Sequence, residues 1–256
     1  MTRIVAIVFP QLMTDWTLRR QPELKDIPFA LALADRGRRV VKAVNIVAQE
    51  KGVLIDMVVA DCKAILPELL VLDYDPEQPK KLLIALAEWC IRYAPVVAID
   101  PPNGLLMDAS GCTHLWGSEA AYLKTIQERF RKFGYNTQLA ITDTIGCSWA
   151  MCRFKNTISI VPPGKQTQAL SLLPPAALRL EDVITERLTK LGLLTIESFI
   201  GMPRPALRRR FGATLLTRLD QATGAELEML EPVKPIPPYE ERLPSMEPIR
   251  TAIGIE

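Results

Sequence analysis

The chain has 256 residues, of which 48% are hydrophobic, so it is long and apolar enough for one large domain or two to three small ones. Its 31 Lys and Arg residues against 29 Asp and Glu residues give a net charge of +2, a balance too mild to indicate nucleic-acid binding by itself. The longest apolar run falls short of the roughly 20 residues that a membrane helix needs, and the N-terminus shows no signal-peptide pattern. We therefore expect a globular, cytoplasmic protein without a membrane segment.

The five cysteines favour buried free thiols over disulfides or a metal site. Their number is odd, they are widely spaced among mostly apolar neighbours, and no Cys-x-x-Cys sequence occurs. They are Cys62, Cys90, Cys112, Cys147 and Cys152. We expect neither a bound metal nor a cofactor.

Strands and helices alternate over the first 161 residues. Apolar runs bounded by turn residues predict strands, and apolar residues three and four positions apart predict amphipathic helices. The predicted strands span residues 3–9, 29–34, 38–44, 95–100, 104–110, 137–142 and 157–161. The predicted helices span residues 58–69, 76–94, 118–134 and 144–154. An order β-α-β-β-α-β is formed by the elements at 3–9, 76–94, 95–100, 104–110, 118–134 and 137–142. This order predicts an α+β fold, with an antiparallel sheet and two helices on one of its faces.

From about residue 166 the strand signals disappear. Five short helices broken by Pro and Gly are predicted, so we expect a second, all-helical domain. These helices span residues 166–174, 180–193, 195–202, 204–212 and 213–224. Six prolines between residues 232 and 248 then predict an extended linker, and the last residues look like the opening of another element.

Three segments resemble motifs of the Y-family DNA polymerases. The segment RRQPELKDIPFALA is similar to the one after the family's first catalytic motif, AQEKGV to its fingers, and IRYAPVVAIDPPNGLLMDASG to its second catalytic motif. Residues 87–117 resemble in particular the ImuB branch of this family, whose members are catalytically inactive, polymerase-like proteins of the bacterial mutasome. The resemblance implies a palm at 1–165 with fingers at about 12–69, a helical thumb at 166–230, and a proline-rich linker at 231–256 into an incomplete little finger.

The resemblance also implies where a polymerase would hold its catalytic metal ions. A nucleotidyl transferase needs several carboxylates around two divalent ions. Counting from the matched motifs, the first catalytic aspartate falls on Val8 and the next ligand near Pro10. The Asp-Glu pair of the second motif falls on Asn103 and Gly104. An amide oxygen is a weak neutral ligand and the other side chains offer none, so we expect a vacated metal site.

The contacts to the triphosphate are expected to be missing as well. The Tyr and the Arg that hold the triphosphate in active relatives match Ile46 and Gln49 here. The loss of metal ligands together with phosphate contacts favours the loss of polymerisation. The alternative is a divergent but active lesion-bypass polymerase, with Asp15, Asp100 and Asp108 as substitute ligands.

Two further groups of residues have both a functional and a structural interpretation. On a strand, Cys112 and His114 would share one face, which suits the nucleophile and the base of a small-molecule enzyme. The chain has no second histidine, however, so a packed thiol beside a histidine bonded to the backbone is favoured. Trp89, Trp116 and Trp149 are expected in the core rather than as platforms for base stacking.

The predicted helical domain carries the candidate DNA contacts. The sequence ERLTKLGLLTIESF resembles a helix-hairpin-helix, in which Lys190 and Gly192 would lie at a phosphate-binding turn. Residues 201–219 contain five arginines and no acid. Three consecutive ones suit phosphate contacts, although they also fit a solvated face. They are Arg208, Arg209 and Arg210.

By resemblance, the protein would act in damage-induced (SOS) translesion DNA synthesis without adding nucleotides itself. Its implied partners are DNA, bound weakly and without sequence preference, the RecA-like protein ImuA, the error-prone C-family polymerase ImuC and the sliding clamp. The sequence QALSLL at residues 168–173 loosely resembles a clamp-binding hexapeptide, but we expect its leucines to be buried.

Overall fold

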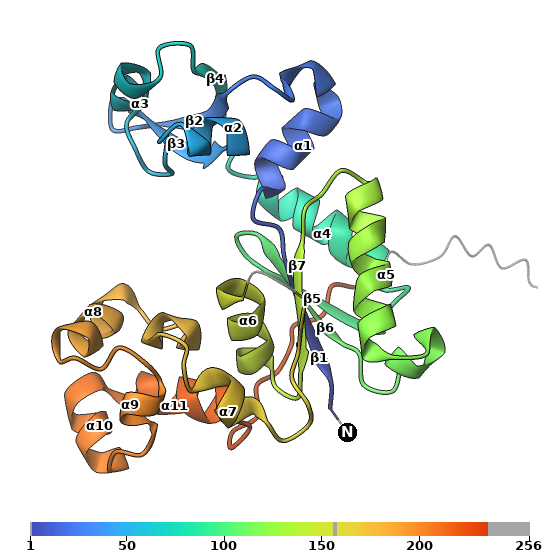
Figure 1. Cartoon of the computed structure of the whole chain (residues 1–256), viewed down its shortest axis with the longest axis vertical. Coiled ribbons are helices and arrows are strands. Elements are labelled where there is room, and N and C mark those ends of the chain that lie inside the picture. Colours follow the sequence, from blue (N-terminus) through green and yellow to red (C-terminus); the bar gives the residue numbers. More distant parts are fainter. Residues whose placement is uncertain (1, 156–157, 235–256) are drawn as a thin grey trace, which may run out of the picture.

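The structure, a computed structural model, describes residues 2–155 and 158–234. These residues form two β-sheets and a group of helices (Figure 1). The strands are β1 (Ile4–Val8), β2 (Phe29–Asp35), β3 (Arg38–Val44), β4 (Leu70–Asp73), β5 (Val96–Asp100), β6 (Gly104–Asp108), β7 (Gln138–Thr142) and β8 (Ser159–Ile160). The helices of the first 155 residues are α1 (Leu12–Arg20), α2 (Ile46–Glu50), α3 (Val59–Ile65), α4 (Gln78–Cys90), α5 (Glu119–Lys132) and α6 (Ile145–Phe154). The helices that follow are α7 (Gln166–Leu170), α8 (Asp182–Lys190), α9 (Glu197–Ile200), α10 (Arg204–Phe211) and α11 (Ala213–Thr223). Short 3-10 helices are η1 (Pro22–Leu24), η2 (Thr113–Trp116) and η3 (Pro175–Leu178).

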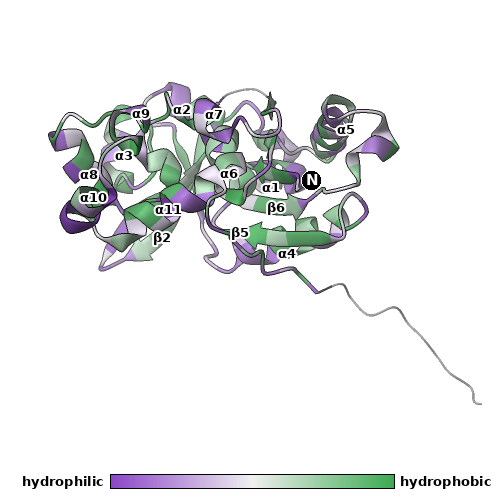
Figure 2. Ribbon diagram, turned by 90° about the horizontal axis from the view of Figure 1, so that it is seen from below, coloured by the Kyte–Doolittle hydropathy of each residue, from purple (hydrophilic) through white to green (hydrophobic). Residues whose placement is uncertain are grey.

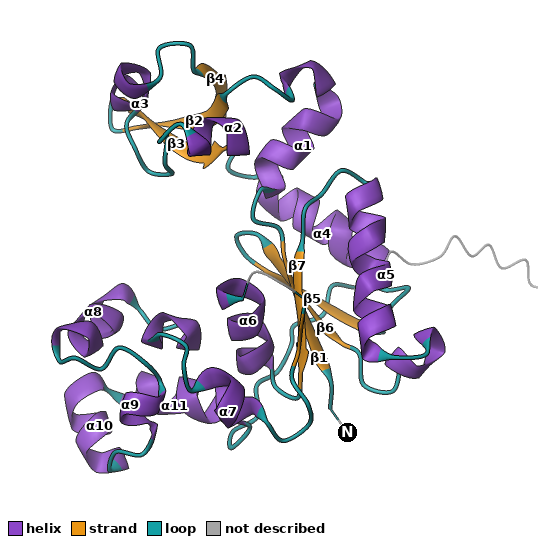
Figure 3. Cartoon of the chain, in the orientation of Figure 1, coloured by secondary structure: helices purple, strands orange, loops and turns teal. Residues whose placement is uncertain are grey.

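The large sheet has the strand order β5-β6-β1-β7-β8. Helices α4 and α5 cover one of its faces, and α6 covers the other (Figure 3). Strands β5, β6, β1 and β7 pair antiparallel, whereas β8 adds in parallel to β7. The order β1, α4, β5, β6, α5, β7 along the chain confirms the predicted split βαβ fold with two helices on one face.

Strand β1 lies in the middle of this sheet and is apolar at every position. Ile4, Ala6 and Val8 pack toward α6, whereas Val5 and Ile7 pack toward α4 and α5. A strand with helices on both faces buries all of its side chains, so its sequence reads as a continuous apolar run instead of an alternation. Figure 2 shows the same hydrophobic character along β5 and β6.

The small sheet, of order β3-β2-β4, lies between β1 and α4 in the chain and has a core of its own. The predicted turn DRGR joins β2 to β3, and Arg36 and Gly37 take the positive φ angles of 46° and 78° that such a tight turn needs. The sequence patterns do not predict α1 or β4. Helix α1 buries Thr14, Asp15 and Thr17 and so lacks an apolar stripe, and β4 has only four residues.

The helical part of the chain, Gln166–Thr223, contains all five predicted helices. Its buried side chains join those of α6 in one core, so this part packs on the α6 side of the large sheet. The leucines of QALSLL are buried as expected at Leu170 and Leu173, but Leu172 is 73% exposed. Two of the three leucines are therefore core residues.

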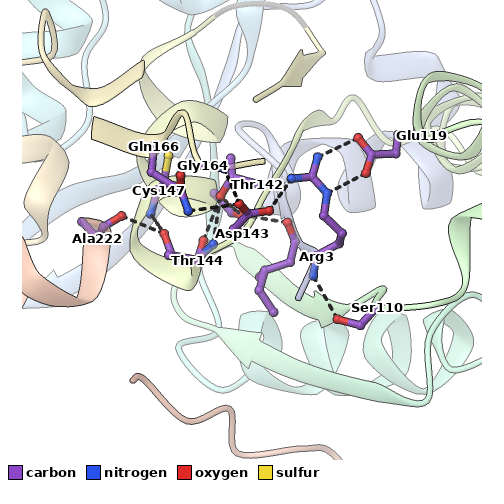
Figure 4. Close-up of polar contacts among 12 residues, drawn as sticks. Arg3, Ser110, Glu119, Thr142, Asp143, Thr144, Cys147, Gly164, Gln166 and Ala222 are labelled. Atoms are coloured by element: carbon purple, nitrogen blue, oxygen red, sulfur yellow. Dashed lines mark hydrogen bonds and ion pairs between the residues drawn. The ribbon is translucent and has the colours of Figure 1, made fainter. Parts of the chain in front are cut away.

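A polar network ties the start of β1 to the helical part (Figure 4). The Arg3 guanidinium donates to both carboxylate oxygens of Glu119 at 2.6 Å and to Asp143 at 2.7 Å. The other oxygen of Asp143 accepts from the backbone of Gly164 at 2.8 Å and from the Gln166 amide at 3.1 Å. Arg3 is 6% exposed, and its two carboxylate partners satisfy the charge that burial would otherwise leave unpaired.

Helix α6 also contacts α11 directly. The Thr144 hydroxyl caps α6 by accepting from the Cys147 amide at 3.1 Å, and it donates to the carbonyl of Ala222 at 2.8 Å. A Cβ placed on Gly146 would lie 2.8 Å from the Cα of Ala222, so only glycine permits this close approach. The palm-like sheet and the helical part are thus held together by hydrogen bonds as well as by apolar packing.

Only the first residues of the predicted proline-rich linker belong to the described part of the chain. The Val233 amide donates to the carbonyl of Val97 at 2.7 Å, which places this residue against β5. Residues 235–256, with the rest of the expected linker, lie outside the described residues. Among the helices that are described, none has both the length and the apolar character required to cross a membrane.

Candidate functional site

The positions expected to carry catalytic carboxylates meet at one end of the large sheet. Val8 ends β1 and lies directly opposite Gly104, which begins β6, while Asp100 at the end of β5 lies opposite Gly104 on the other side. Asn103 is in the turn between β5 and β6, where its carbonyl accepts from the Phe9 amide at 2.8 Å and its side-chain amide donates to the Phe9 carbonyl at 3.2 Å. The fold therefore places Val8, Asn103 and Gly104 side by side.

A guanidinium group from α6 fills the space beside Gly104. The Arg153 Nη2 atom lies 2.8 Å from Asp100 Oδ2 and 3.5 Å from Asn103 Oδ1. A Cβ placed on Gly104 would lie 2.8 Å from both Arg153 Nη2 and Asp100 Oδ2, and 3.0 Å from the Asp100 carbonyl oxygen. The Arg153 guanidinium also stacks on the Trp149 ring, with its Cζ 4.5 Å from the ring centroid. A side chain at position 104 would displace this ion pair.

The Arg153–Asp100 pair is mostly shielded from water, since the two side chains are 16% and 17% exposed. Neither Arg153 Nη1 nor Asp100 Oδ2 makes a hydrogen bond to another described residue, so charge and ring stacking hold the pair instead of a bidentate hydrogen-bonded fork. A role of Arg153 in this site was not predicted from the sequence. The one feature that sets it apart there is that it is the single charged residue of a mostly apolar helix.

The chemistry of these groups does not fit a pair of divalent cations. Magnesium prefers carboxylate and water oxygens in near-ideal octahedral geometry. Here an alkyl side chain at Val8, a bare backbone at Gly104 and one carboxylate at Asp100 surround a resident cation, the guanidinium of Arg153. Within residues 2–155 and 158–234, no group of three or more His, Cys, Asp or Glu side chains could hold a metal ion.

The three aspartates suggested as substitute ligands are not brought together. Asp100 and Asp108 lie at opposite ends of the β5–β6 pair, since Asp100 is opposite Gly104 and Asp108 is opposite Val96. The Asp108 carboxylate accepts instead from the Ser110 amide at 2.9 Å. Asp15 is on α1 and accepts from a backbone amide of the α5–β7 loop. The geometry therefore gives no support to a metal site built from these three residues.

Asp15 is a buried carboxyl group whose polar contacts come from Asn136. It is 5% exposed, and its Oδ2 accepts from the Asn136 amide at 2.8 Å. Burial raises the pKa of Asp15 from its ordinary value of 3.8 to about 6, and the hydrogen bond from Asn136 offsets only part of this rise. Ionisation of Asp15 at neutral pH therefore lowers the stability of the folded chain.

We expect Asp15→Asn to be more stable than the parent chain at pH 7.5 by up to about 3 kcal/mol, the equivalent of about two pKa units. Because the folded-state pKa is raised, the parent keeps full stability from this group below about pH 4 and loses it as the pH rises through 6. The advantage of the variant should thus vanish between pH 6 and pH 4 in urea denaturation. Asp26→Asn, at an exposed position, is the control for charge alone; equal pH dependence of the two variants would contradict the prediction.

A cleft of about 460 Å³ opens next to the expected catalytic end, between the large sheet and the small sheet. Its walls are largely apolar, and Lys42, the charged residue among them, is paired with Asp56 at 2.7 Å. Gln49, one of the two expected triphosphate positions, lines the cleft and accepts from Gln11 at 3.2 Å. Ile46, the other position, begins α2 and is 50% exposed. Among the described residues, the cleft wall therefore has no unpaired cation that could bind a triphosphate.

The predicted helix-hairpin-helix corresponds to α8, a turn and α9. Gly192 has φ 75° at the turn, and its amide and those of Leu191 and Leu193 donate to carbonyls of α8 at 2.9–3.1 Å. Lys190 is exposed and pairs with Glu186 at 3.4 Å. These amides are therefore used within the hairpin, which leaves less of the turn for a phosphate than the sequence motif suggests.

The run of five arginines is less basic in the structure than in the sequence. Arg204 pairs with Asp220, and Arg218 lies 3.3 Å from Glu228, which also pairs with Arg179 at 2.5 Å, so two of the five have an acid from just beyond the run beside them. The other three are exposed in the last turn of α10 and have no ion pair with a described residue. They are Arg208, Arg209 and Arg210.

Cys112 and His114 do not share a strand, which corrects that expectation. Cys112 is the N-cap of η2 and His114 lies within it, because the chain turns after β6 instead of extending. The Cys112 thiol donates to the Ser110 carbonyl at 3.6 Å, and His114 is exposed. No hydrogen bond between the two side chains is found among the described residues, so a nucleophile–base pair is not formed.

The three tryptophans have different surroundings. Trp89 and Trp116 are partly buried and pack on the core between the large sheet and α4 and α5, as expected. Trp149 is instead half-buried beneath the guanidinium groups of Arg153 and Arg179, at 4.5 and 5.9 Å from the ring centroid.

Comparisons with solved structures show the fold. The post-insertion binary complex of Dbh DNA polymerase matches with a TM-score of 0.78 at 14% identity, over 90% of this chain and 69% of that one. DinB from Sulfolobus solfataricus matches with a TM-score of 0.75 at 14% identity and the same coverage. The α+β fold with a Y-family polymerase-like palm is thereby confirmed.

Comparisons of sequence show the family. Protein ImuB of Caulobacter vibrioides is 44% identical over 190 residues, which are 74% of this chain but only 42% of ImuB. DNA polymerase IV of Serratia proteamaculans is 22% identical over 250 residues, which cover 93% of this chain and 65% of that protein. The model of the family described as "IMS: impB/mucB/samB family" matches residues 7–153, more than half of the chain. The chain therefore belongs to the impB/mucB/samB family.

Proposed function

We propose that this chain is a non-catalytic, polymerase-like accessory protein of damage-induced translesion DNA synthesis. The observation that carries the proposal is the ion pair of Arg153 with Asp100 beside Gly104, at the end of the sheet where catalytic carboxylates are expected. Phosphoryl transfer depends on metal ions and on fixed positions of the triphosphate. The guanidinium group, the alkyl side chain of Val8 and the side chains Ile46 and Gln49 supply neither.

Primer extension tests this proposal. We expect no template-directed incorporation by this chain with magnesium or manganese, over a range of nucleotide concentrations, on undamaged templates and on templates with a lesion. A DNA polymerase IV measured in parallel is the positive control. If the parent chain incorporates nucleotides and the Gly104→Glu variant does not, the proposal is contradicted and the divergent, active polymerase is supported.

The partners of the whole protein are proposed from its similarity to ImuB. A polymerase-like chain without synthesis of its own would act as a scaffold that brings the sliding clamp, the RecA-like ImuA and the C-family polymerase ImuC together on damaged DNA. This chain spans 42% of the ImuB proteins it matches, so recruitment of each partner is a property to be tested on the longer protein. Co-purification with each partner, with and without the region beyond residue 230, tests which part is needed.

We further propose that the helical part of this chain is a thumb that contacts DNA phosphates through Arg208–Arg210. Replacing all three with alanine should flatten the dependence of log affinity on log salt by about 2 to 3, because each lost phosphate contact removes about 0.9 on duplex DNA. A control variant, Lys63, Lys80 and Lys81→Ala, removes the same charge from exposed positions outside the helical part. Equal slopes for the two variants, measured by fluorescence anisotropy, would assign Arg208–Arg210 to a solvated face.

A further inference from the structure

Three helix ends meet on the side of the large sheet opposite α6, and they are rich in exposed cations. Helix α1 ends at Arg20, α5 ends at Lys132, and α4 is followed closely by Arg92. We define the helix-end surface by the six exposed cations at these ends. They are Arg19, Arg20, Arg92, Arg129, Arg131 and Lys132.

Contacts between these ends show that they form one surface. The Arg19 side chain passes over Gly134, where an added Cβ would lie 3.0 Å from Arg19 Cγ, so the end of α1 touches the loop after α5. The Trp89 ring of α4 lies 5.0 Å from the ring of Phe133, directly after α5. Figure 1 shows the end of α5 beside α1. The cations are thus neighbours in space although they come from segments more than 100 residues apart.

Aromatic rings, rather than acids, hold three of the arginines. The guanidinium groups lie over the rings of Tyr135, Trp16 and Trp89, with Cζ to centroid distances of 5.0, 4.9 and 4.7 Å for Arg19, Arg20 and Arg92. Such stacking fixes a guanidinium plane while N–H groups stay available at its edge. In Arg92 the Nε–H donates to the Trp89 carbonyl at 2.9 Å, which leaves the terminal N–H groups for a ligand.

The six cations of the helix-end surface have no ion pair with any described residue. The acids on the same helices are few: Glu119 pairs with Arg3, Glu128 is 3.9 Å from Lys124, Glu88 is half-buried, and Asp15 is buried. A local excess of positive charge therefore stands out in a chain whose net charge is +2. Charge that is neither paired nor balanced attracts a polyanion.

We propose that the helix-end surface binds single-stranded nucleic acid, at a site separate from the helical part. Five of its six cations are arginines, whose planar forks match phosphate oxygens in bidentate geometry. Phe133, 37% exposed at the centre of this surface, offers an apolar ring on which a base stacks. The large sheet separates this surface from Arg153 and from the helical part, which pack on the other face. A strand bound here is held on the outer side of the palm-like sheet.

The test is anisotropy of a labelled single-stranded oligo(dT) across a range of salt concentrations, with the whole chain. Arg129, Arg131 and Lys132→Ala should lower the slope of log affinity against log salt by about 2, since each phosphate contact on a single strand contributes about 0.7. The affinity at low salt should fall at least tenfold. The matched control Lys63, Lys80 and Lys81→Ala should change it less than threefold. Equal losses in the two variants would overturn the proposal.

A second variant tests the aromatic contact and the class of ligand. Phe133→Ala should weaken oligo(dT) binding about fivefold or more through the lost stacking, with duplex DNA affected less. An acidic peptide of matched charge should not compete with oligo(dT); full competition would overturn the choice of nucleic acid in favour of an acidic protein segment. Arg208–Arg210→Ala is measured alongside. Loss of oligo(dT) binding in Arg129, Arg131 and Lys132→Ala but not in Arg208–Arg210→Ala separates this site from the proposed thumb contact, whereas loss in Arg208–Arg210→Ala alone would overturn the proposal.

Discussion

A variant that restores the expected carboxylates, with Val8→Asp, Asn103→Asp and Gly104→Glu, should be less stable than the parent chain and should still fail to extend a primer. The first effect follows from the space that these side chains would enter. Val8 is 4% exposed in the middle strand, so a carboxylate there would be taken out of water. At Gly104 the new Cβ would meet the Arg153–Asp100 pair at 2.8 Å and push it apart.

The loss of stability should be large. Overpacking at a close-packed position costs about 1–3 kcal/mol, and an uncompensated buried charge adds to it through like-charge repulsion with Asp100. A total of about 3–5 kcal/mol corresponds to a fall in Tm of about 6–20 °C for a chain of this size. Thermal denaturation measured by circular dichroism, with Asn103→Asp alone as the mild control, checks this expectation.

Synthesis should stay absent even where the metal ligands are given room. Adding Arg153→Ala to the triple variant removes the resident cation and the contact with position 104. Ile46 and Gln49 remain, and a triphosphate that is not held in place lacks the positioning on which its transfer depends. Incorporation by the quadruple variant above the background of the parent would show that only the metal ligands were lost, and it would return the chain to the active polymerases.

The parts of the fold that the sequence predicted are those in which local pattern and tertiary packing agree. Strand β1 is a continuous apolar run because helices cover both of its faces. Helix α5 has Ser118 as its N-cap, whose hydroxyl accepts from the Ala121 amide, and it stops before Gly134, which has φ 80°. Helix α1 escaped prediction because its buried side chains Thr14 and Thr17 are polar and bond to backbone carbonyls. A helix whose buried side chains are polar cannot be predicted from the spacing of apolar residues.

The candidate site was predictable where its residues belong to motifs that resemble those of a known family, and not elsewhere. The meeting of Val8 with Gly104 follows from motifs that lie on paired strands. The Arg153–Asp100 pair joins α6 to β5, and nothing in either local sequence indicates the other partner. In the same way, the acids Asp220 and Glu228 that neutralise part of the arginine run lie just beyond it in the chain, where counting charges within the run misses them.

The second large effect is expected at Arg153. Arg153→Ala should destabilise the chain by about 2–4 kcal/mol, because the loss of one partner leaves the other as an unpaired charge in a mostly buried place. Asp100→Asn should cost less, since Arg153 keeps its stacking on the Trp149 ring when the carboxylate is gone. Urea denaturation followed by tryptophan fluorescence measures both changes.

The double variant Arg153→Ala with Asp100→Asn tests whether the pair acts as a unit. If the guanidinium group neutralises Asp100 in place of a metal ion, the double variant should be more stable than the sum of the single losses predicts, with a coupling of about 1–3 kcal/mol. Arg92→Ala is a matched control, because Arg92 also stacks on a tryptophan ring, at 4.7 Å, but is exposed and forms no ion pair with a described residue; its Nε donates to the Trp89 carbonyl at 2.9 Å. Its loss should cost about 0.5–1 kcal/mol, the value of an exposed cation–π contact. Additive losses at Arg153 and Asp100, or a cost at Arg153 no greater than at Arg92, would mean that ring stacking alone accounts for Arg153 and that its charge does not compensate for missing metal ions.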